Sequence, residues 1–151
     1  MTKQYAVRQH EIACGHRVVG HEGKCRHLHG HGYVFHFYCE ASQLDALGRV
    51  IDFSVIKSKL CMWLEEHWDH RMLLWERDPL AHAFHELSGS IHDPEELFGQ
   101  SVELVPCNPT AENLSEYLLN VIGPAQLAGT GVTLMKVIVE ETRKCWAVSE
   151  L

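Results

Sequence analysis

The stretch HRVVGHEGKCRHLHGHGYVFHFYCEA, residues 16–41, decides how this chain folds. Its last part, Tyr33–Ala41, is dense in aromatic and β-branched residues, which is typical of a β-strand. A looser alternation over Tyr5–Cys14 predicts another strand before it. The Gly- and His-rich segment between the two is expected to be a loop that merges into the later strand.

His29 and His31 stand two residues apart where this loop becomes strand, so both side chains are expected on one face. If the two strands pair as a hairpin, His16 arrives beside them. Three neutral imidazoles with an open fourth position are typical of a catalytic zinc site. Spacing alone leaves two other interpretations open: a closed zinc site that includes Cys25 and His27, which share the same parity, or a chance histidine-rich loop.

Cys25 differs from the cysteines that lie in apolar runs, such as Cys39 and Cys61. It is flanked by Lys24 and Arg26 in a polar loop, and positive neighbours raise the thiolate fraction of a cysteine. The pattern therefore favours a reactive group. The six cysteines are scattered without paired spacing and are interpreted as free thiols.

Two helices are predicted further along the chain. Apolar residues at spacings of three and four over 53–67 indicate the first, with Asp52 as its N-cap. The second covers Leu114–Ile122, with Thr110 as its cap. Residues 76–106 are less regular, with a short helix expected in DPLAHAFHEL and a short strand in SVELVP.

Two acidic positions stand out. Glu141 belongs to the final predicted strand, VTLMKVIVEET, and by alternation it should face the same side as Met135, Val137 and Val139. A carboxylate there is costly unless it is paired. Asp69 and His70 follow the first helix, where they form either an acid–base pair or a solvated helix end.

The composition narrows the function. The chain has 151 residues and a formal net charge of -7, which argues against a nucleic-acid partner. No apolar run reaches the ~18 residues of a membrane span, and the polar start lacks a signal peptide, so a cytoplasmic protein is expected. Paired strands followed by helices suggest an α+β fold with an antiparallel sheet and helices on one face.

In this order, several motifs resemble the 6-pyruvoyl-tetrahydropterin synthase / 6-carboxy-tetrahydropterin synthase family. They are CGHR at 14–17, KCRHLHGHGY at 24–33, VIDFSVIK at 50–57, WDHRML at 68–73, NPTAEN at 108–113 and VEET at 139–142. The resemblance implies the T-fold (tunnelling fold), a four-stranded antiparallel sheet with two helices on one face. It also implies one domain over 1–151, with a longer insertion around 76–99. Homo-oligomers are implied as well, in which the sheets of three subunits close a barrel and two trimers stack into a hexamer.

The same resemblance implies roles for individual residues. His16, His29 and His31 correspond to the ligands of Zn²⁺, and Cys25 to the catalytic thiol, a general base. Asp69 and His70 correspond to its partner pair, supplied by a neighbouring subunit. Glu141 corresponds to the anchor of the pterin ring, and Thr110 and Glu112 to further residues of the pterin pocket.

Only Arg26, His27 and Leu28 separate Cys25 from His29, and this short gap resembles the carboxy branch. That branch is a zinc-dependent lyase which converts 7,8-dihydroneopterin triphosphate to 6-carboxy-tetrahydropterin, acetaldehyde and triphosphate in queuosine and 7-deazapurine synthesis. The sequence departs from the family pattern at CysGly before His16 and at His27. If the change at His27 removes a triphosphate contact, Lys24, Arg26 and Arg71 must serve instead. The alternatives are a 6-pyruvoyl-tetrahydropterin synthase and a non-catalytic zinc- or pterin-binding protein.

Overall fold

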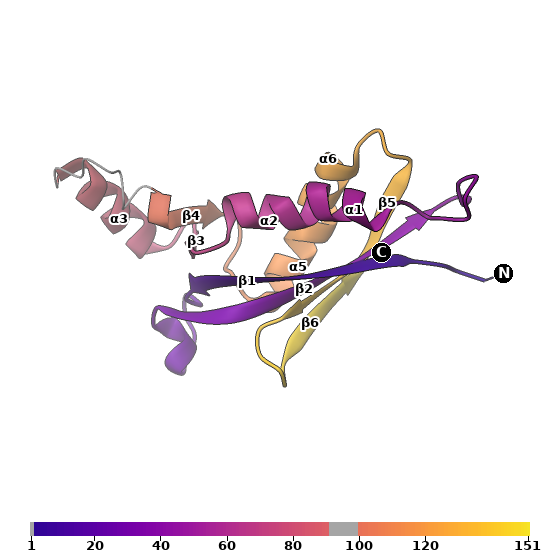
Figure 1. The fold of residues 1–151 in the computed structure, drawn as a ribbon. Helices are drawn as coiled ribbons and strands as arrows, with labels where there is room; N and C mark the ends of the chain where they lie inside the picture. Colours follow the sequence, from indigo (N-terminus) through magenta and orange to yellow (C-terminus); the bar gives the residue numbers. More distant parts are fainter. Residues whose placement is uncertain (1, 91–99) are drawn as a thin grey trace.

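The computed structural model describes residues 2–90 and 100–151 and is a curved sheet with helices over one face (Figure 1). The strand order is β4-β3-β1-β2-β5-β6. The strands are β1 (Ala6–His16), β2 (His29–Ala41), β3 (Met72–Trp75), β4 (Val102–Val105), β5 (Val132–Glu140) and β6 (Trp146–Glu150). Strands β1, β2, β5 and β6 form the antiparallel four expected from the resemblance. The parallel strands β3 and β4 extend this sheet beyond β1, so the sheet is mixed and six-stranded, which corrects the expected four.

The predicted hairpin is confirmed and is longer than its sequence pattern suggested. Strand β1 continues to His16, and β2 already begins at His29, where the two residues face each other in the register. The Gly-rich segment 29–32 therefore belongs to the strand. Glycine is a poor strand former, but here each residue pairs with one on β1.

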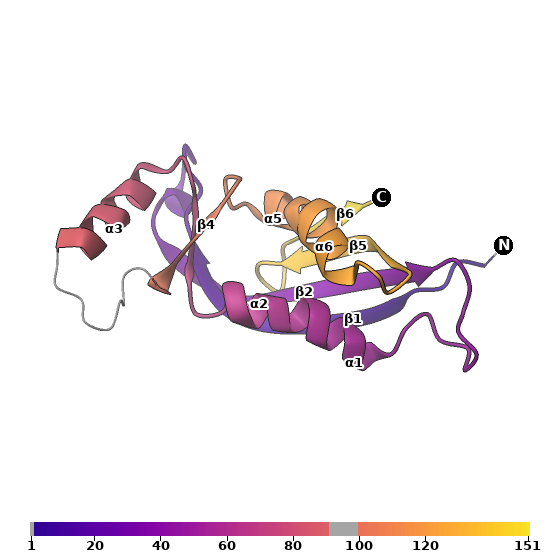
Figure 2. The same ribbon diagram turned by 90° about the horizontal axis from the view of Figure 1, so that it is seen from above.

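Both predicted helices are present, and each contains one π-helical turn. The first consists of α1 (Phe53–Ile56), the turn Lys57–Cys61 and α2 (Met62–His67). The second consists of α5 (Ala111–Tyr117), the turn Leu118–Ile122 and α6 (Gly123–Leu127). The two helical rods lie next to each other over the sheet (Figure 2).

The caps are those predicted. The Asp52 carboxylate accepts a hydrogen bond from Ser54 N at 2.8 Å, and Thr110 Oγ1 accepts one from Asn113 N at 3.1 Å. The second helix runs past its predicted end at Ile122, and Pro124 stands at the start of α6, directly after the π-helical turn.

The core lies between the helices and one face of the sheet. Its largest fully buried side chains on β2 are Tyr33, Phe35 and Phe37, and Trp68 at the end of α2 joins them. Phe35 contacts both Tyr33 and Trp68, with ring centroids 5.9 Å apart in each case. Because alternate β2 residues face the core, this row of aromatic side chains continues directly into His31 and His29.

Two strands and one face assignment were not predicted correctly. Strands β3 and β6 were missed. Met135 is the extra residue of a β-bulge opposite Tyr38 and Cys39, so Leu134 rather than Met135 shares the buried face with Val137.

The short strand expected in SVELVP is β4. The short helix expected in DPLAHAFHEL is α3 (Pro79–Ser90), which lies beyond the end of the sheet (Figure 2). The rest of the expected insertion, 91–99, is outside the described residues. In the part of the chain that the structure covers, no helix is long and apolar enough to cross a membrane.

Candidate metal centre

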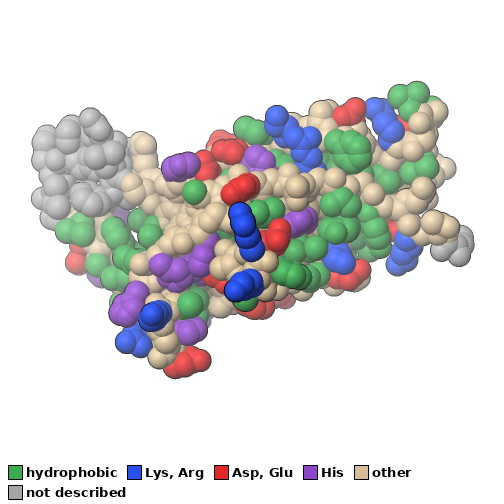
Figure 3. Space-filling model, turned by 60° about the horizontal axis from the view of Figure 1, so that its bottom comes forward, with side chains coloured by type: hydrophobic (Ala, Val, Ile, Leu, Met, Phe, Trp, Pro, Cys, Tyr) green, Lys and Arg blue, Asp and Glu red, His purple; other side chains and the backbone are tan. Residues whose placement is uncertain are grey.

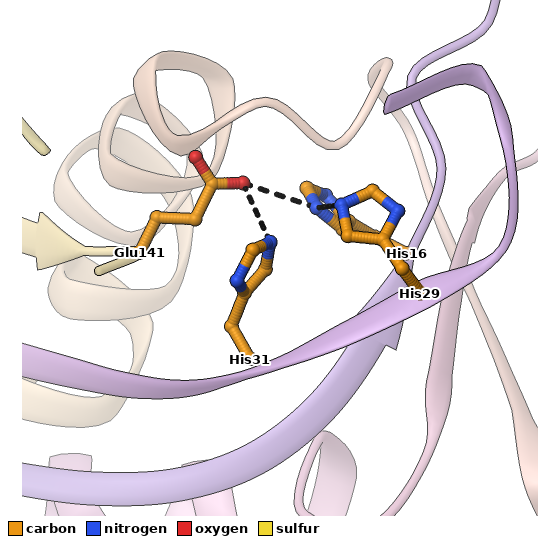
Figure 4. A group of neighbouring side chains, drawn as sticks. All are labelled: His16, His29, His31 and Glu141. Carbon is orange, nitrogen blue, oxygen red and sulfur yellow. Dashed lines mark hydrogen bonds and ion pairs between the residues drawn. The ribbon is translucent and has the colours of Figure 1, made fainter. Parts of the chain in front are cut away.

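Three histidines converge at the loop end of the β1–β2 hairpin, and Glu141 faces them from the end of β5 (Figure 4). Their ligand atoms all lie within 4.8 Å of one another. His16 closes β1 directly opposite His29, and His31 follows on the same face. The predicted meeting of the three imidazoles is therefore confirmed.

The hydrogen bonds of His16 and His29 fix which ring nitrogen carries the proton. His16 Nδ1 lies 2.7 Å from the Pro109 carbonyl oxygen, and His29 Nδ1 lies 2.7 Å from the His27 carbonyl oxygen. A carbonyl oxygen only accepts, so both Nδ1 atoms donate and both Nε2 atoms carry lone pairs in the neutral rings. Such carbonyl contacts are typical of metal-binding histidines.

The two Nε2 atoms nevertheless lie only 3.1 Å apart. Glu141 Oε1, another acceptor, lies 3.1 Å from His16 Nε2 and 3.2 Å from His31 Nε2. Lone pairs this close repel one another unless a cation lies between them. His31 Nε2 is buried and forms no hydrogen bond with any described residue. The donor set therefore fits a metal ion with imidazole ligands, such as Zn²⁺.

The protonation states agree with this interpretation. Burial lowers the pKa of His31, and the neighbouring His16 and His29 lower it further against the opposing effect of Glu141. The close contact with the His16 ring lowers the pKa of Glu141, against the opposing effect of burial. These shifts favour a neutral His31 and an ionised Glu141, the forms that bind metals.

Tyr33 forms the floor of this site. Its ring is edge-on to His31 at 5.3 Å and to His16 at 5.8 Å between centroids. Its hydroxyl is buried and forms no hydrogen bond with the residues that the structure describes. Burial raises the pKa of Tyr33, so the hydroxyl stays protonated and can only act as a neutral donor or acceptor.

Cys25 lies outside the metal-capable group. It sits in a single 3₁₀ turn, Lys24–Arg26, so the strand parity on which the closed Cys/His site depended does not reach residue 25. The side chain is half-buried. Figure 3 shows histidine, lysine and arginine side chains gathered at the end of the molecule where this loop projects.

Asp69 and His70 form a pair, with His70 Nδ1 2.7 Å from Asp69 Oδ2. Burial would raise the pKa of Asp69, but hydrogen bonds from His70 and from Ala13 N outweigh it and lower the pKa. His70 has φ of 59°, a left-handed conformation that costs a non-glycine residue energy. Its side chain is 80% exposed, so the pair presents its imidazole outward.

His70 lines a pocket of about 750 Å³. The pocket also borders Gly15, Gly30 and Gly32, which alternate with the candidate metal ligands along their strands. Phe84 of α3 completes one side. His29 and His31 also line this pocket, whereas Cys25 does not.

The remaining predicted residues lie at the start of α5. Thr110 is the N-cap, and Glu112 in the first turn is exposed. Sequence reasoning missed two features here: Pro109 supplies the carbonyl that orients His16, and Asn108 holds the loop after β1. Both stand in the motif NPTAEN, but nothing local in that motif indicates contact with residues about ninety positions earlier.

A second connection to the same loop was also missed. The Arg17 guanidinium binds the fully buried Asp78 carboxylate through Nε at 2.7 Å and through Nη2. Asp78 Oδ1 also accepts a hydrogen bond from Leu80 N at 2.8 Å. This ion pair ties the start of the loop to the start of α3.

An α+β sheet of this topology with a His/Glu group at its hairpin end defines a T-fold protein with a site that fits a metal ion. Residues 5–150 match the family model of 6-pyruvoyl tetrahydropterin synthase. The chain belongs to this family.

Its relatives include a 6-carboxy-5,6,7,8-tetrahydropterin synthase from Rickettsia felis, 36% identical over 93% of this chain and 95% of that protein. The corresponding Rickettsia bellii protein is 35% identical over the same shares. An uncharacterised protein from Wolinella succinogenes has a similar structure, with a TM-score of 0.84 at 23% identity over 99% of each chain. The 6-pyruvoyl tetrahydropterin synthase of Plasmodium vivax has a TM-score of 0.69 at 18% identity over 98% of each chain. At these identities the structures establish the T-fold.

Proposed function

We propose that this protein is a zinc-dependent 6-carboxy-5,6,7,8-tetrahydropterin synthase. It would convert 7,8-dihydroneopterin triphosphate to 6-carboxy-tetrahydropterin, acetaldehyde and triphosphate, in the cytoplasm and for 7-deazapurine synthesis. The observation that carries the proposal is the convergence of three imidazole acceptors and one carboxylate in a chain whose full-length relatives have this name.

His16, His29 and His31 would hold the metal, since their Nε2 atoms converge. Bound Zn²⁺ supplies a Lewis acid that polarises substrate oxygens and acidifies adjacent C–H and O–H groups. The carbonyls of Pro109 and His27 keep two of these rings in the tautomer and orientation that binding needs.

Cys25 is proposed as the general base that takes a proton from the substrate side chain. Its half-buried position leaves the thiol open on one side. The partner pair Asp69–His70 would come from a neighbouring subunit, because His70 points outward and Cys25 does not line the pocket that His70 borders. This arrangement requires a homo-oligomer, with a trimer or hexamer as the expected form.

Glu141 is proposed as the pterin anchor. Its lowered pKa keeps it ionised, and an ionised carboxylate accepts the N–H donors of a pterin ring. Thr110 and Glu112 would complete the pocket, and Lys24, Arg26 and Arg71 would contact the triphosphate.

The proposal is tested by incubating the zinc-loaded protein with 7,8-dihydroneopterin triphosphate and identifying the products by mass spectrometry. Carboxy-tetrahydropterin with acetaldehyde is expected. A pyruvoyl product without acetaldehyde would replace this function with the pyruvoyl synthase. Unchanged substrate, from protein that holds one zinc per chain, would leave a binding role.

Replacing Cys25 separates catalysis from metal binding. Cys25→Ala should retain zinc and lose turnover, by about two orders of magnitude or more for a lost general base. Cys145→Ala is the matched control, because this thiol is exposed in the β5–β6 turn. Loss of zinc in Cys25→Ala would instead indicate a closed metal site that includes the thiol.

A further inference from the structure

Asn108 joins two parts of the chain that are far apart in sequence. Its side-chain Oδ1 accepts a hydrogen bond from Val19 N at 2.9 Å, and its Nδ2 donates to Val19 O at 3.0 Å. The amide thus satisfies both backbone groups of one loop residue, as a neighbouring strand would. No strand pairs with this loop residue among the described elements, so Asn108 takes that place.

Asn108 is itself held at the start of α5. Its carbonyl oxygen accepts from Thr110 N at 2.7 Å and from Asn113 Nδ2 at 2.9 Å. Both donors belong to the cap or first turn of that helix. The amide therefore projects from a fixed base.

The next bond along the loop reaches Cys25. Val18 N, adjacent to the clamped Val19, donates to the Cys25 carbonyl at 2.8 Å. The backbone of the turn that carries the thiol is thus fixed to the segment that Asn108 holds. On the other side, Pro109, adjacent to Asn108, accepts from His16 Nδ1. Asn108 is therefore adjacent to Pro109, which orients the candidate ligand His16, and it holds Val19, whose neighbour Val18 is bonded to Cys25.

We infer that Asn108 is a positioning residue that sets the place of the Cys25 thiol relative to His16. Its catalytic consequence rests on the proposed function, whereas its effect on the thiol itself does not. Directed hydrogen bonds suit this task because Lys24, Arg26 and the other exposed residues of the turn offer little packing to hold it.

Alkylation of Cys25 tests the inference directly. Wild type, Asn108→Ala and Asn108→Asp are exposed to iodoacetamide across a range of pH, and modification of the Cys25 peptide is followed by mass spectrometry. Asn108→Asp keeps the acceptor for Val19 N but opposes an oxygen to Val19 O, and it serves if the alanine variant does not fold. Thr130→Val is the matched control, since it removes two side chain–backbone hydrogen bonds from a loop at the other end of the sheet.

We expect a roughly threefold to tenfold faster alkylation of Cys25 in the Asn108 variants, because a released turn exposes the thiol. At the same time kcat should fall about tenfold with little change in KM, as for a misplaced catalytic group. Thr130→Val should change neither the alkylation rate of Cys25 nor kcat by more than about twofold. An unchanged rate of Cys25 alkylation in a folded Asn108 variant would overturn the inference. Faster alkylation in a protein whose wild type has no synthase activity would support the positioning role and refute the proposed function.

Discussion

The helix-facing side of the β1–β2 hairpin has two halves. At the loop end it carries His16, His29 and His31, and further along β2 it carries Phe35 and Phe37. Both halves share one register and one alternation. The aromatic half is held by packing, with side chains that are at most 1% exposed. In the histidine half, a hydrogen bond to the distant Pro109 carbonyl holds His16, and one to the nearby His27 carbonyl holds His29.

This difference separates what stabilises the fold from what prepares the site. Packing is insensitive to direction and tolerates substitution by residues of similar volume. The imidazoles of His16 and His29 instead each donate through Nδ1, and their Nε2 acceptors lie close to each other and to Glu141 at a cost in repulsion. A substitution in one half should therefore leave the property of the other half largely intact.

The largest effect is expected from His29→Ala. It removes one of the converging Nε2 atoms, so the affinity for Zn²⁺ should fall about a thousandfold or more, which corresponds to ~4 kcal/mol. Competition with a chromophoric chelator measures this. His36→Ala is the control on the same strand, because His36 pairs with Glu140 on the opposite face; a comparable loss of affinity there would contradict the assignment.

Phe35→Ala should produce the reverse pattern. A fully buried Phe that is truncated to Ala leaves a cavity and costs about 3–4 kcal/mol of stability. Below the unfolding transition the variant should still bind one zinc per chain. Urea unfolding followed by tryptophan fluorescence gives the stability, and loss of stoichiometric zinc in the folded variant would show that the two halves are not independent.

The hairpin and the meeting of three histidines could be predicted because both follow from local alternation. Glu141 was expected to face the same side as Met135, Val137 and Val139, and it keeps the parity of the buried Val137 and Val139. Only Met135 was wrong, because the bulge there shifts the parity of the preceding residues, and no local signal announces it. That Glu141 lies against His16 and His31 depends on the long-range pairing of β2 with β5.

The elements that were missed are also those that depend on distant partners. MLLW at 72–75 is apolar throughout and shows no alternation, and it forms a strand only because β1 and β4 lie on either side of it. WAVSE at 146–150 is short and half-exposed, so its pattern is weak. Asn108 and Pro109 act on residues of β1 and the following loop only after α5 has packed on the sheet, so the sequence motif could suggest their importance but not their partners.

An intermediate effect is expected at the buried ion pair of Asp78 and Arg17. Burial alone would raise the pKa of Asp78, but hydrogen bonds from Arg17 and from Leu80 N outweigh it, and the net pKa is lowered. A lowered pKa in the folded state stabilises the protein above the unfolded value of about 3.9, and this contribution is lost as the pH falls through the folded value. Asp78→Asn should lose about 2–3 kcal/mol at pH 7 and show a flatter decline of stability below about pH 4.

Urea titrations from pH 3 to pH 7 measure this dependence. Asp45→Asn is the matched control, because Asp45 pairs with Arg49 on the surface, where ion pairs contribute little. If the stability of Asp78→Asn fell with decreasing pH as steeply as that of the wild type, the buried carboxylate could not be the source of the acid sensitivity.

The smallest effect, and the sharpest test of the boundary between the halves, is expected at Tyr33. Its ring belongs to the aromatic row, whereas its hydroxyl lies in the histidine half without a hydrogen-bond partner among the described residues. An unpartnered buried hydroxyl costs free energy, and an apolar replacement of the same shape removes that cost. Tyr33→Phe in metal-free protein should therefore be as stable as the wild type or more stable by up to ~1 kcal/mol, measured by urea unfolding in a chelating buffer. A loss of more than ~1 kcal/mol would mean that the hydroxyl is bonded in the folded metal-free protein, and that the directed hydrogen bonds of the histidine half extend one residue further along β2.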